Sequence, residues 1–242
     1  MYGHRTGSRH RLPSPIILLA AAAMLVAAAA LIWPELSSEA SFAQVRDRVP
    51  AGDPAAMIDG ARAMNPDTVA WLKVDGTPID YPVVQPSGNM DRDWYLRHGY
   101  DGAKSPMGTP YLDSRCDADG PLMLAYAHND RTGRLFHAIA NAEGDKGLER
   151  IGTAHWTTGA GETEFEPLFA IRVDRAYAPV QDISAASEDI AELIEEMHGK
   201  AVSEREGWRE AAGGAGRILA LSTCTNGTFG GPERIICIFA AP

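Results

Sequence analysis

Short apolar segments, each bounded by turn-forming residues, follow one another through most of the chain after residue 66. Two of them flank Asp75-Gly76-Thr77, a sequence typical of a tight turn between paired strands. The segments with the length and pattern of strands are 69–74, 79–85, 109–112, 121–127, 164–173, 217–223 and 234–239, with a weaker candidate at 147–153. Many short strands with few helices favour a closed or nearly closed β-barrel.

Two helical segments interrupt the predicted strands. Residues 135–142 have apolar side chains at a spacing compatible with a helix. Residues 187–198 repeat apolar side chains at steps of three and four, with acidic residues on the other face. Before the barrel, residues 35–65 mix serine, alanine, proline and charge, and they predict a stalk with short helices near 39–49 and 54–64.

The N-terminal region contains three arginines, no acid, and then an uninterrupted apolar run from Ile16 to Trp33. As a helix, this run is about 27 Å long, close to the thickness of a bilayer core. We expect a basic cytoplasmic tail at 1–12, a retained single-pass membrane anchor at 13–34, and an extracellular remainder. The alternative is a cleaved signal peptide, although its apolar core is typically shorter.

The net charge of the chain is −10 even though its N-terminal region is basic, so the remainder is strongly acidic. This charge argues against nucleic acid or an anionic membrane surface as a partner. The residues after the apolar run are enough for one domain with its own core. The sequence has no cysteine or histidine spacing typical of a zinc site, and we expect neither a metal nor a cofactor.

Three side chains at strand ends have the chemistry of a cysteine enzyme. Cys224 ends the segment 217–223, and Arg234 begins the next segment, so a hairpin would bring the guanidinium near the thiol. His128 follows the segment 121–127, and strand ends on one rim of a barrel converge. A thiol has a reference pKa of about 8.5, and a nearby cation favours the thiolate whereas burial opposes it. The pattern predicts a nucleophile, a base and an oxyanion stabiliser, although a lone cysteine or histidine at such a position is more often structural.

The chain has two further cysteines, which makes the total odd, so at least one thiol is free unless it pairs between chains. Cys237 lies inside an apolar segment and is expected to be buried and inert. Cys116 lies among polar residues, and we expect it to be exposed and without a role.

Around these residues the chain resembles the sortases, specifically class B. Residues 221–224, Leu-Ser-Thr-Cys, are similar to the family signature Thr-Leu-x-Thr-Cys, with Ala220 in place of its first threonine. Arg234 and His128 fall at the family arginine and histidine. Segments similar to class B sequences are 69–74, 77–85, 94–96 and 108–113. The resemblance spans residues 66–242.

The resemblance implies a mostly β fold: an eight-stranded sortase-type barrel with N-terminal helices and a helix in the loop between the sixth and seventh strands. The segment 187–198 matches that helix, which in class B helps select the sorting motif. It also implies a cysteine transpeptidase that acts on surface proteins bearing a sorting signal at a Gram-positive cell wall. Cys224 would attack the bond after a threonine, and an amine from a peptidoglycan precursor or a pilin lysine would resolve the thioacyl-enzyme. His128 would exchange protons with both amines, and Arg234 would hold the oxyanion.

The residues that the resemblance implies for substrate binding are Arg92, Leu96, Ser222, Thr223 and Thr225. Two of them depart from the class B pattern. Arg92 stands in place of a substrate-facing asparagine. The residue after the nucleophile is Thr225, so an acid is missing there. The sorting motif therefore stays open.

Three other functions remain as alternatives. A secreted cysteine peptidase would use the same thiol and imidazole but release an acid rather than join an amine. An L,D-transpeptidase would require a Ser-x-Gly-Cys pattern, which is absent around Cys224. A non-enzymatic, membrane-tethered interaction module would form no acyl adduct.

Overall fold

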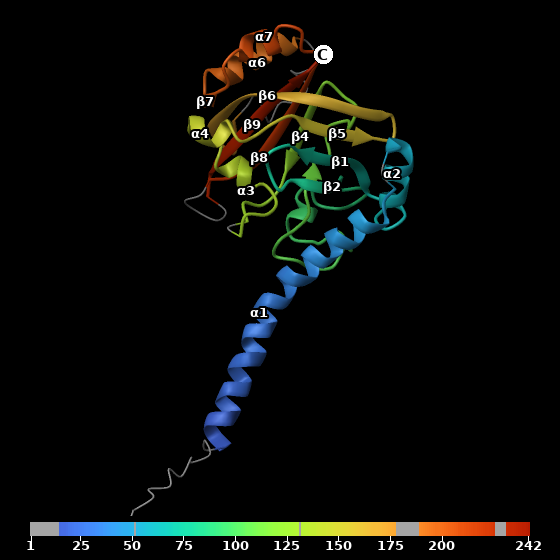
Figure 1. The fold of residues 1–242 in the computed structure, drawn as a ribbon, viewed down its shortest axis with the longest axis vertical. Coiled ribbons are helices and arrows are strands. Elements are labelled where there is room, and N and C mark those ends of the chain that lie inside the picture. The colour runs from blue at the N-terminus through green and yellow to red at the C-terminus, as the bar shows by residue number, and fades with distance from the viewer. Residues whose placement is uncertain (1–14, 51, 131, 178–188, 226–230) are drawn as a thin grey trace, which may run out of the picture.

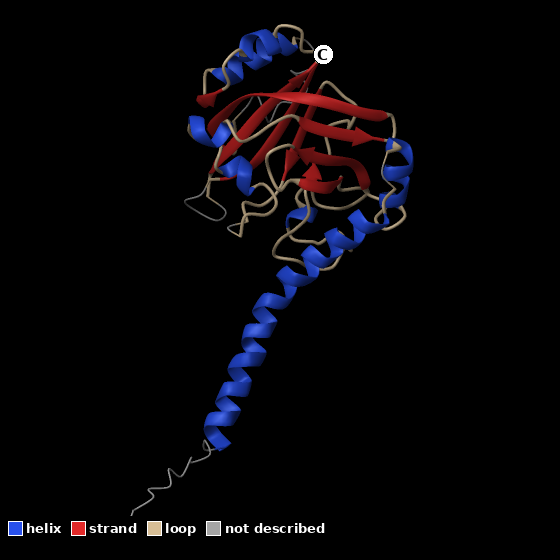
Figure 2. Cartoon of the chain, viewed as in Figure 1, coloured by secondary structure: helices blue, strands red, loops and turns tan. Residues whose placement is uncertain are grey.

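Strands β5, β1, β2, β3, β4, β8, β9, β6 and β7 lie side by side in that order in one continuous sheet. This computed structural model describes residues 15–50, 52–130, 132–177, 189–225 and 231–242 (Figure 1). Strand β5 also pairs with β6, so eight strands close into a ring and β7 lies outside it, against β6. The closed barrel with its small number of described helices confirms the predicted fold (Figure 2). The predicted basic tail at 1–12 lies outside the described residues.

The strands are β1 (Thr68–Val74), β2 (Asp80–Val84), β3 (Tyr111–Leu112), β4 (Leu122–Tyr126), β5 (Ala154–Thr158), β6 (Gly161–Asp174), β7 (Ala201–Glu204), β8 (Arg217–Cys224) and β9 (Glu233–Ala241). The helices are α1 (Pro15–Arg48), α2 (Pro54–Arg62), the 3₁₀ helix η1 (Trp94–Leu96), α3 (His137–Ala140), α4 (Asp145–Leu148), α6 (Ile190–His198) and α7 (Trp208–Ala212).

The turn between β1 and β2 shows how local sequence sets the barrel. Gly76 has a φ of +74°, and a Cβ atom there would lie 2.2 Å from the carbonyl oxygen of Arg150. Only glycine adopts this conformation at so close an approach. The turn leads into an antiparallel ladder in which Leu72 pairs with Tyr81. The predicted hairpin is therefore present.

Two strands were not predicted, and one predicted strand is absent. Strands β5 and β7 are short, and β5 has a histidine and two threonines among its five residues. The segment 147–153 was expected to be a strand, but its first residues belong to α4. The backbone of Gly147 packs on the end of α3, where a Cβ atom would lie 1.8 Å from the carbonyl oxygen of Asn141. This close contact holds the segment in a helical turn away from the sheet.

The barrel interior is filled by large apolar side chains from opposite strands, among them Met123, Trp156, Phe165 and Phe239, all of them fully buried. The C-terminal part of α1 adds to this core from outside the ring. Its Phe42 is buried, and the Phe42 ring contacts the Tyr81 ring edge-on at 5.0 Å between centroids. The rest of α1 extends away from the barrel (Figure 1).

The predicted helix at 187–198 corresponds to α6, although residues 187 and 188 lie outside the described residues. The carboxylate of Asp189 accepts hydrogen bonds from the backbone N–H groups of Ala191 and Glu192, which begins the helix. The predicted apolar face of α6 is buried: Leu193, Ile194 and Met197. Along the chain, α6 lies with β7 and α7 in the connection from β6 to β8. These two strands are the sixth and seventh strands of the ring in chain order. The helix therefore occupies the loop that was expected to contain it.

Within the described part of the chain, no helix combines the length and apolar character that crossing a membrane requires. The expectation of a single-pass anchor at 13–34 followed by an extracellular domain is therefore wrong. It rested on the apolar run in the sequence alone.

Candidate active site

Cys224 is the last residue of β8, and its cross-strand partner in the antiparallel ladder with β9 is Arg234. Directly paired residues place their side chains on the same face of the sheet, with Cβ atoms about 4.5–5.5 Å apart. The thiol is half-buried. Residues 226–230 of the connecting loop lie outside the described residues. The register of two long strands therefore brings the thiol and the guanidinium together, as predicted.

His128 reaches the same place through the parallel pairing of β4 with β8. Tyr126 pairs with Ser222, and beyond this pair the N–H of Ala127 donates to the Ser222 carbonyl at 3.3 Å. The hydroxyl of Thr223 donates to the Ala127 carbonyl at 2.8 Å. Both strands therefore end at the same rim. Strand β4 ends two residues before His128, and β8 ends at Cys224 itself.

A cavity of about 220 Å³ opens at this rim, and all three predicted catalytic side chains line it. Three of the predicted substrate-binding residues also line it, namely Leu96, Ser222 and Thr223. The described lining residues do not include Arg92 or Thr225. The further lining residues are Asp93, Tyr111, Tyr126, Ala127, Val173, Asp174, Arg175, Tyr177 and Ile236.

The imidazole of His128 is held in a defined orientation. Its Nε2 lies 2.8 Å from the carbonyl oxygen of Leu96, and because a carbonyl can only accept, Nε2 has the proton. Burial lowers the pKa of His128 below its ordinary value, and the positive charge of Arg234 lowers it further, whereas the Leu96 carbonyl and Asp130 raise it. The ring is therefore neutral at neutral pH, and Nδ1 is its acceptor nitrogen.

The guanidinium of Arg234 is anchored through one nitrogen. Its Nη1 donates to the carbonyl of Gly231 at 2.6 Å and to that of Glu233 at 2.9 Å. An arginine has five N–H donors in a planar fork, so anchoring at one nitrogen leaves capacity to bind an oxyanion.

Ser222 is a polar residue of the cavity whose hydrogen-bonding capacity is not satisfied by the described residues. Its side chain lines the cavity, is 1% exposed, and its hydroxyl has no hydrogen-bond partner among the described residues. A buried hydroxyl without a partner costs about 1–3 kcal/mol. A substrate amide in the cavity would supply that partner.

Several cavity residues were not found from the sequence. Tyr111 and Tyr126 stack with centroids 5.3 Å apart, and burial raises the pKa of Tyr111 above its usual range. Asp174 and Arg175 come directly after the predicted strand 164–173, so the strand-end position that identified Cys224 also applied to them. Asp93 lies in a turn before η1 and has no such signal.

The side chain of Arg92, which was predicted to bind substrate, contacts Asp113 and is not among the described residues that line the cavity. Its Nη2 lies 3.2 Å from a carboxylate oxygen of Asp113, which is buried and also receives hydrogen bonds from Arg115. Burial opposes ionisation of Asp113, but the hydrogen bonds and charge of Arg115 outweigh it and hold the pKa of the carboxyl below its usual value. Thr225 is also buried.

The other two thiols are buried. Cys116 was expected to be exposed, which is wrong: it packs into the core, its sulfur accepts a hydrogen bond from the Leu124 N–H, and burial raises its pKa to about 11. Cys237 is fully buried, as predicted, and burial raises its pKa as well. Among the three cysteines, Cys224 is the one that lines the cavity.

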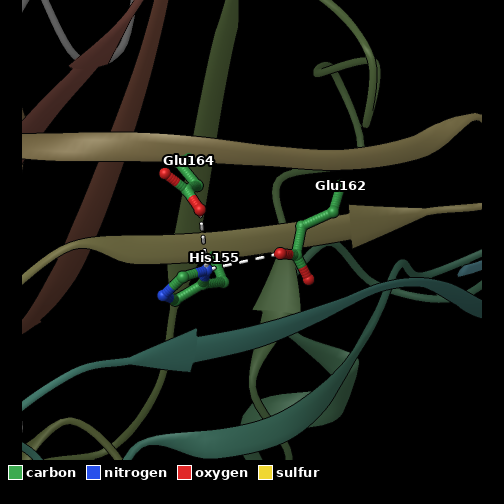
Figure 3. Close-up of side chains that lie close together, drawn as sticks. All are labelled: His155, Glu162 and Glu164. Atoms are coloured by element: carbon green, nitrogen blue, oxygen red, sulfur yellow. Dashed lines mark hydrogen bonds and ion pairs between the residues drawn. The ribbon is translucent and has the colours of Figure 1, made fainter. Parts of the chain in front are cut away.

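One group of side chains in the described residues has three metal-ligand atoms within reach of one another: His155, Glu162 and Glu164 on the β5–β6 hairpin (Figure 3). The ring nitrogens of His155 lie 3.4 Å from Glu162 and 3.2 Å from Asp75. Burial lowers the pKa of His155, but the hydrogen bond and charge of Asp75 outweigh it and raise it. Ion pairing with a protonated imidazole accounts for this exposed group, so we assign no metal to it.

No protein-family model matches the chain. Sortase B of Listeria monocytogenes is 24% identical over 163 residues, an alignment that covers 66% of this chain and 64% of that protein. The chain thus spans slightly less than two thirds of the length of this relative.

Two solved structures share the fold. A class B sortase of Streptococcus pyogenes involved in pilus biogenesis is 27% identical with a TM-score of 0.62, covering 75% of this chain and 96% of that one. A Staphylococcus aureus sortase B–substrate complex is 17% identical with a TM-score of 0.69, covering 86% of this chain and 97% of that one. Taken with the eight-stranded ring and the thiol at its rim, these similarities support a class B sortase.

Proposed function

We propose that this chain is a cysteine transpeptidase that cleaves a C-terminal sorting signal after a threonine and joins the acyl group to an amine. The observation that supports this function best is the cavity shared by Cys224, His128 and Arg234. Its thiol is half-buried rather than buried, so a peptide carbonyl can reach the sulfur.

The neutral imidazole of His128 suits the first step. It accepts the thiol proton as the sulfur attacks the threonine carbonyl, so that a C–S bond forms and the carbonyl oxygen becomes an oxyanion. With reference pKa values, an uncoupled thiol and imidazole are roughly 1% thiolate–imidazolium at equilibrium. The imidazolium then gives its proton to the departing amine as the C–N bond breaks.

The second step reverses the proton transfer. The incoming amine attacks the thioacyl carbonyl and forms a C–N bond, and His128 accepts a proton from the amine. The C–S bond then breaks, and the imidazolium returns the proton to the sulfur. Arg234 donates to the oxyanion in both steps. In a cavity with little water, one such donor lowers the barrier by a few kcal/mol.

Leu96, Ser222 and Thr223 are the residues that we propose to contact the sorting signal from the cavity wall. Leu96 offers an apolar side chain, and the Ser222 hydroxyl, which has no hydrogen-bond partner among the described residues, offers a hydrogen bond. Arg92 and Thr225 stay predictions as substrate contacts.

We propose surface proteins bearing a sorting signal as acyl donors, and a peptidoglycan-precursor amine or a pilin lysine as acceptor. The substrate complex of the Staphylococcus aureus enzyme supports the donor class, and the role of the Streptococcus pyogenes enzyme in pilus biogenesis supports the pilin lysine.

The experiment gives a library of threonine-containing peptides to the full chain, with and without an amine acceptor, and traps the acyl-enzyme with hydroxylamine. Mass spectrometry should find a thioacyl adduct on Cys224 and a ligated product when the amine is present. Release of acid alone would support the cysteine peptidase instead. Absence of any adduct would support the non-enzymatic module.

A further inference from the structure

The backbone ladder between β4 and β8 stops just before the catalytic residues. Its last described rung is the bond from the Ala127 N–H to the Ser222 carbonyl. In a parallel ladder, the rungs that follow would be the bond from the Cys224 N–H to the Ala127 carbonyl, and then the bond from the N–H of residue 129 to the carbonyl of residue 224. The backbone of Asn129 instead forms an isolated antiparallel bridge with Leu135.

The side chain of Asn129 occupies the place of that missing rung. Its Nδ2 lies 3.3 Å from the carbonyl oxygen of Cys224. The amide group thus continues the ladder by one step after the backbone of β4 has turned away. Through it, the segment that contains His128 is tied to the residue that contains the thiol.

A histidine fixes the orientation of this amide. Nδ1 of His137, at the start of α3, lies 2.8 Å from Oδ1 of Asn129. The carbonyl of Cys224 can only accept, so the NH₂ group must face Cys224 and Oδ1 must face His137. Since an amide oxygen can only accept, Nδ1 of His137 is then the donor of this contact. The opposite orientation would place two acceptors together at Cys224.

The segment that contains His128 also has contacts within itself. The Phe136 N–H donates to the His128 carbonyl at 3.1 Å, and Arg134 pairs with Asp130 at 2.6 Å. Leu135 adopts a φ of +51°, a conformation that a leucine adopts only when its surroundings impose it. These contacts hold the described residues around His128, and the Asn129 side chain links them to the end of β8.

We infer that Asn129 is a positioning residue for the reaction at Cys224, and that His137 orients it; this role rests on the proposed function. Asn129 holds the Cys224 carbonyl and so sets the distance and angle between the sulfur and the adjacent imidazole. A neutral amide performs this role without adding charge near the thiolate. An aspartate would face the carbonyl with an acceptor and would add a negative charge beside the sulfur.

The test compares Asn129→Ala, Asn129→Asp and His137→Ala in the full chain. The readout is the pH dependence of iodoacetamide alkylation at Cys224, mapped by peptide mass spectrometry, together with kcat and KM for a peptide substrate. Charged or titratable side chains that share the cavity are Asp93, Tyr111, Tyr126, His128, Asp174, Arg175, Tyr177 and Arg234, and none is altered.

Loss of Asn129 should lower kcat by on the order of tenfold to a hundredfold, with little change in KM, because small misplacements of reacting groups have effects of this size. The alkylation profile should shift to higher pH in Asn129→Ala, and further in Asn129→Asp. His137→Ala should shift it in the same direction by less. A fourth protein that combines Asn129→Ala with His137→Ala should match Asn129→Ala alone, since both residues act through one contact.

The matched control is Gln85→Ala. The Gln85 amide also bridges backbone carbonyls, those of Asp113 and Cys116 at 2.9 and 2.8 Å, but it lies outside the catalytic cavity. The Gln85→Ala substitution should lower the melting temperature without shifting the alkylation profile of Cys224. An unshifted profile in folded Asn129→Ala, or an equal shift in the control, would overturn the inference. If the wild type forms no acyl-enzyme, the transpeptidase proposal fails, while the alkylation profile still reports the coupling of Asn129 to Cys224.

Discussion

Cys224 and Arg234 are paired residue to residue at the open end of the β8–β9 ladder. The same ladder runs without interruption to the pair Arg217 and Ala241, through strands whose side chains are nearly all buried. A slip of one residue would exchange the side chains of the two buried faces and break their packing, so the register is strongly specified. The meeting of thiol and guanidinium is therefore a property of the barrel core rather than of the loop between the strands.

Replacing the proposed nucleophile should remove the acyl-enzyme without unfolding the barrel. Cys224→Ala deletes one half-buried sulfur, and we expect no thioacyl adduct by intact-mass measurement and a melting temperature near that of the wild type. Cys116→Ala is the control, because that thiol is buried and its pKa is raised to about 11. An adduct that persists in Cys224→Ala would contradict the assignment.

Exchanging the proposed oxyanion donor for lysine should affect turnover more than stability. Arg234 uses Nη1 for the carbonyls of Gly231 and Glu233, and a lysine has a single nitrogen for both this anchoring and the oxyanion. We expect Arg234→Lys to lower kcat by roughly a hundredfold to a thousandfold, the usual loss for one oxyanion donor.

The control for that change is Arg172→Lys, on the neighbouring strand β6. Arg172 pairs with Glu143 and Glu233 at the surface, and exposed pairs contribute little. Its turnover should stay near that of the wild type. Parallel losses of kcat and melting temperature in Arg234→Lys would instead indicate a structural arginine.

The lowered pKa of His128 predicts a pH dependence of stability. Since the folded pKa lies below the unfolded one, the unfolded chain binds the proton first as the pH falls. The stability of the wild type relative to His128→Gln should therefore decrease as the pH drops below about 6.5, and then level off below the folded pKa. Urea unfolding of both proteins between pH 5 and 8 measures this difference. A constant difference across the range would show that burial does not shift this histidine.

The sequence predicted those parts of the fold and site that depend on local pattern. Strands with long apolar runs, such as β8 and β9, were found. The residues predicted to be catalytic, His128, Cys224 and Arg234, were identified because each lies at the end of such a run, and the structure places them around one cavity. Strands β5 and β7 were missed because their pairing with β1 and β6, rather than their own residues, makes them strands. Tyr111 lies in the predicted strand segment 109–112, but nothing in that segment marked its side chain as part of the cavity.

Tertiary partners also explain the expectations that proved wrong. Cys116 lies in a polar stretch of sequence, yet its sulfur packs under β4 and receives a hydrogen bond from Leu124. No local pattern contains that contact, which joins residues from separate segments. The N-terminal apolar run gave a strong local signal, but the described helices do not bear out a membrane span.

The hydroxyls of Ser222 and Thr223 allow a substrate contact to be distinguished from a structural contact by mutation. Ser222→Ala removes a buried polar atom without breaking a hydrogen bond among the described residues, so stability should be unchanged or slightly higher. Thr223→Val is its matched neighbour, and it should cost about 1 kcal/mol because it removes the bond to the Ala127 carbonyl. We expect Ser222→Ala to raise KM for the sorting peptide while melting normally. An unaltered KM would leave the hydroxyl without a role in binding.

The two arginines on Asp113 predict different responses, which bear on the role of Arg92. Asp113 has a lowered folded pKa, so the stability from its ion pairs should be complete above about 3.9 and should be lost as the pH falls through the folded pKa. Arg115 makes the shorter contact at 2.7 Å, whereas the Arg92 side chain is 58% exposed. Arg115→Ala should therefore destabilise the protein, and Arg92→Ala should change the free energy of unfolding by less than about 1 kcal/mol. Urea unfolding measures the change in stability of both variants. The peptide library then tests substrate recognition: if Arg92 contacts the sorting signal, Arg92→Ala must change the order of preferred motifs even though its stability is normal. An unchanged order would show that Arg92 is only a surface partner of Asp113.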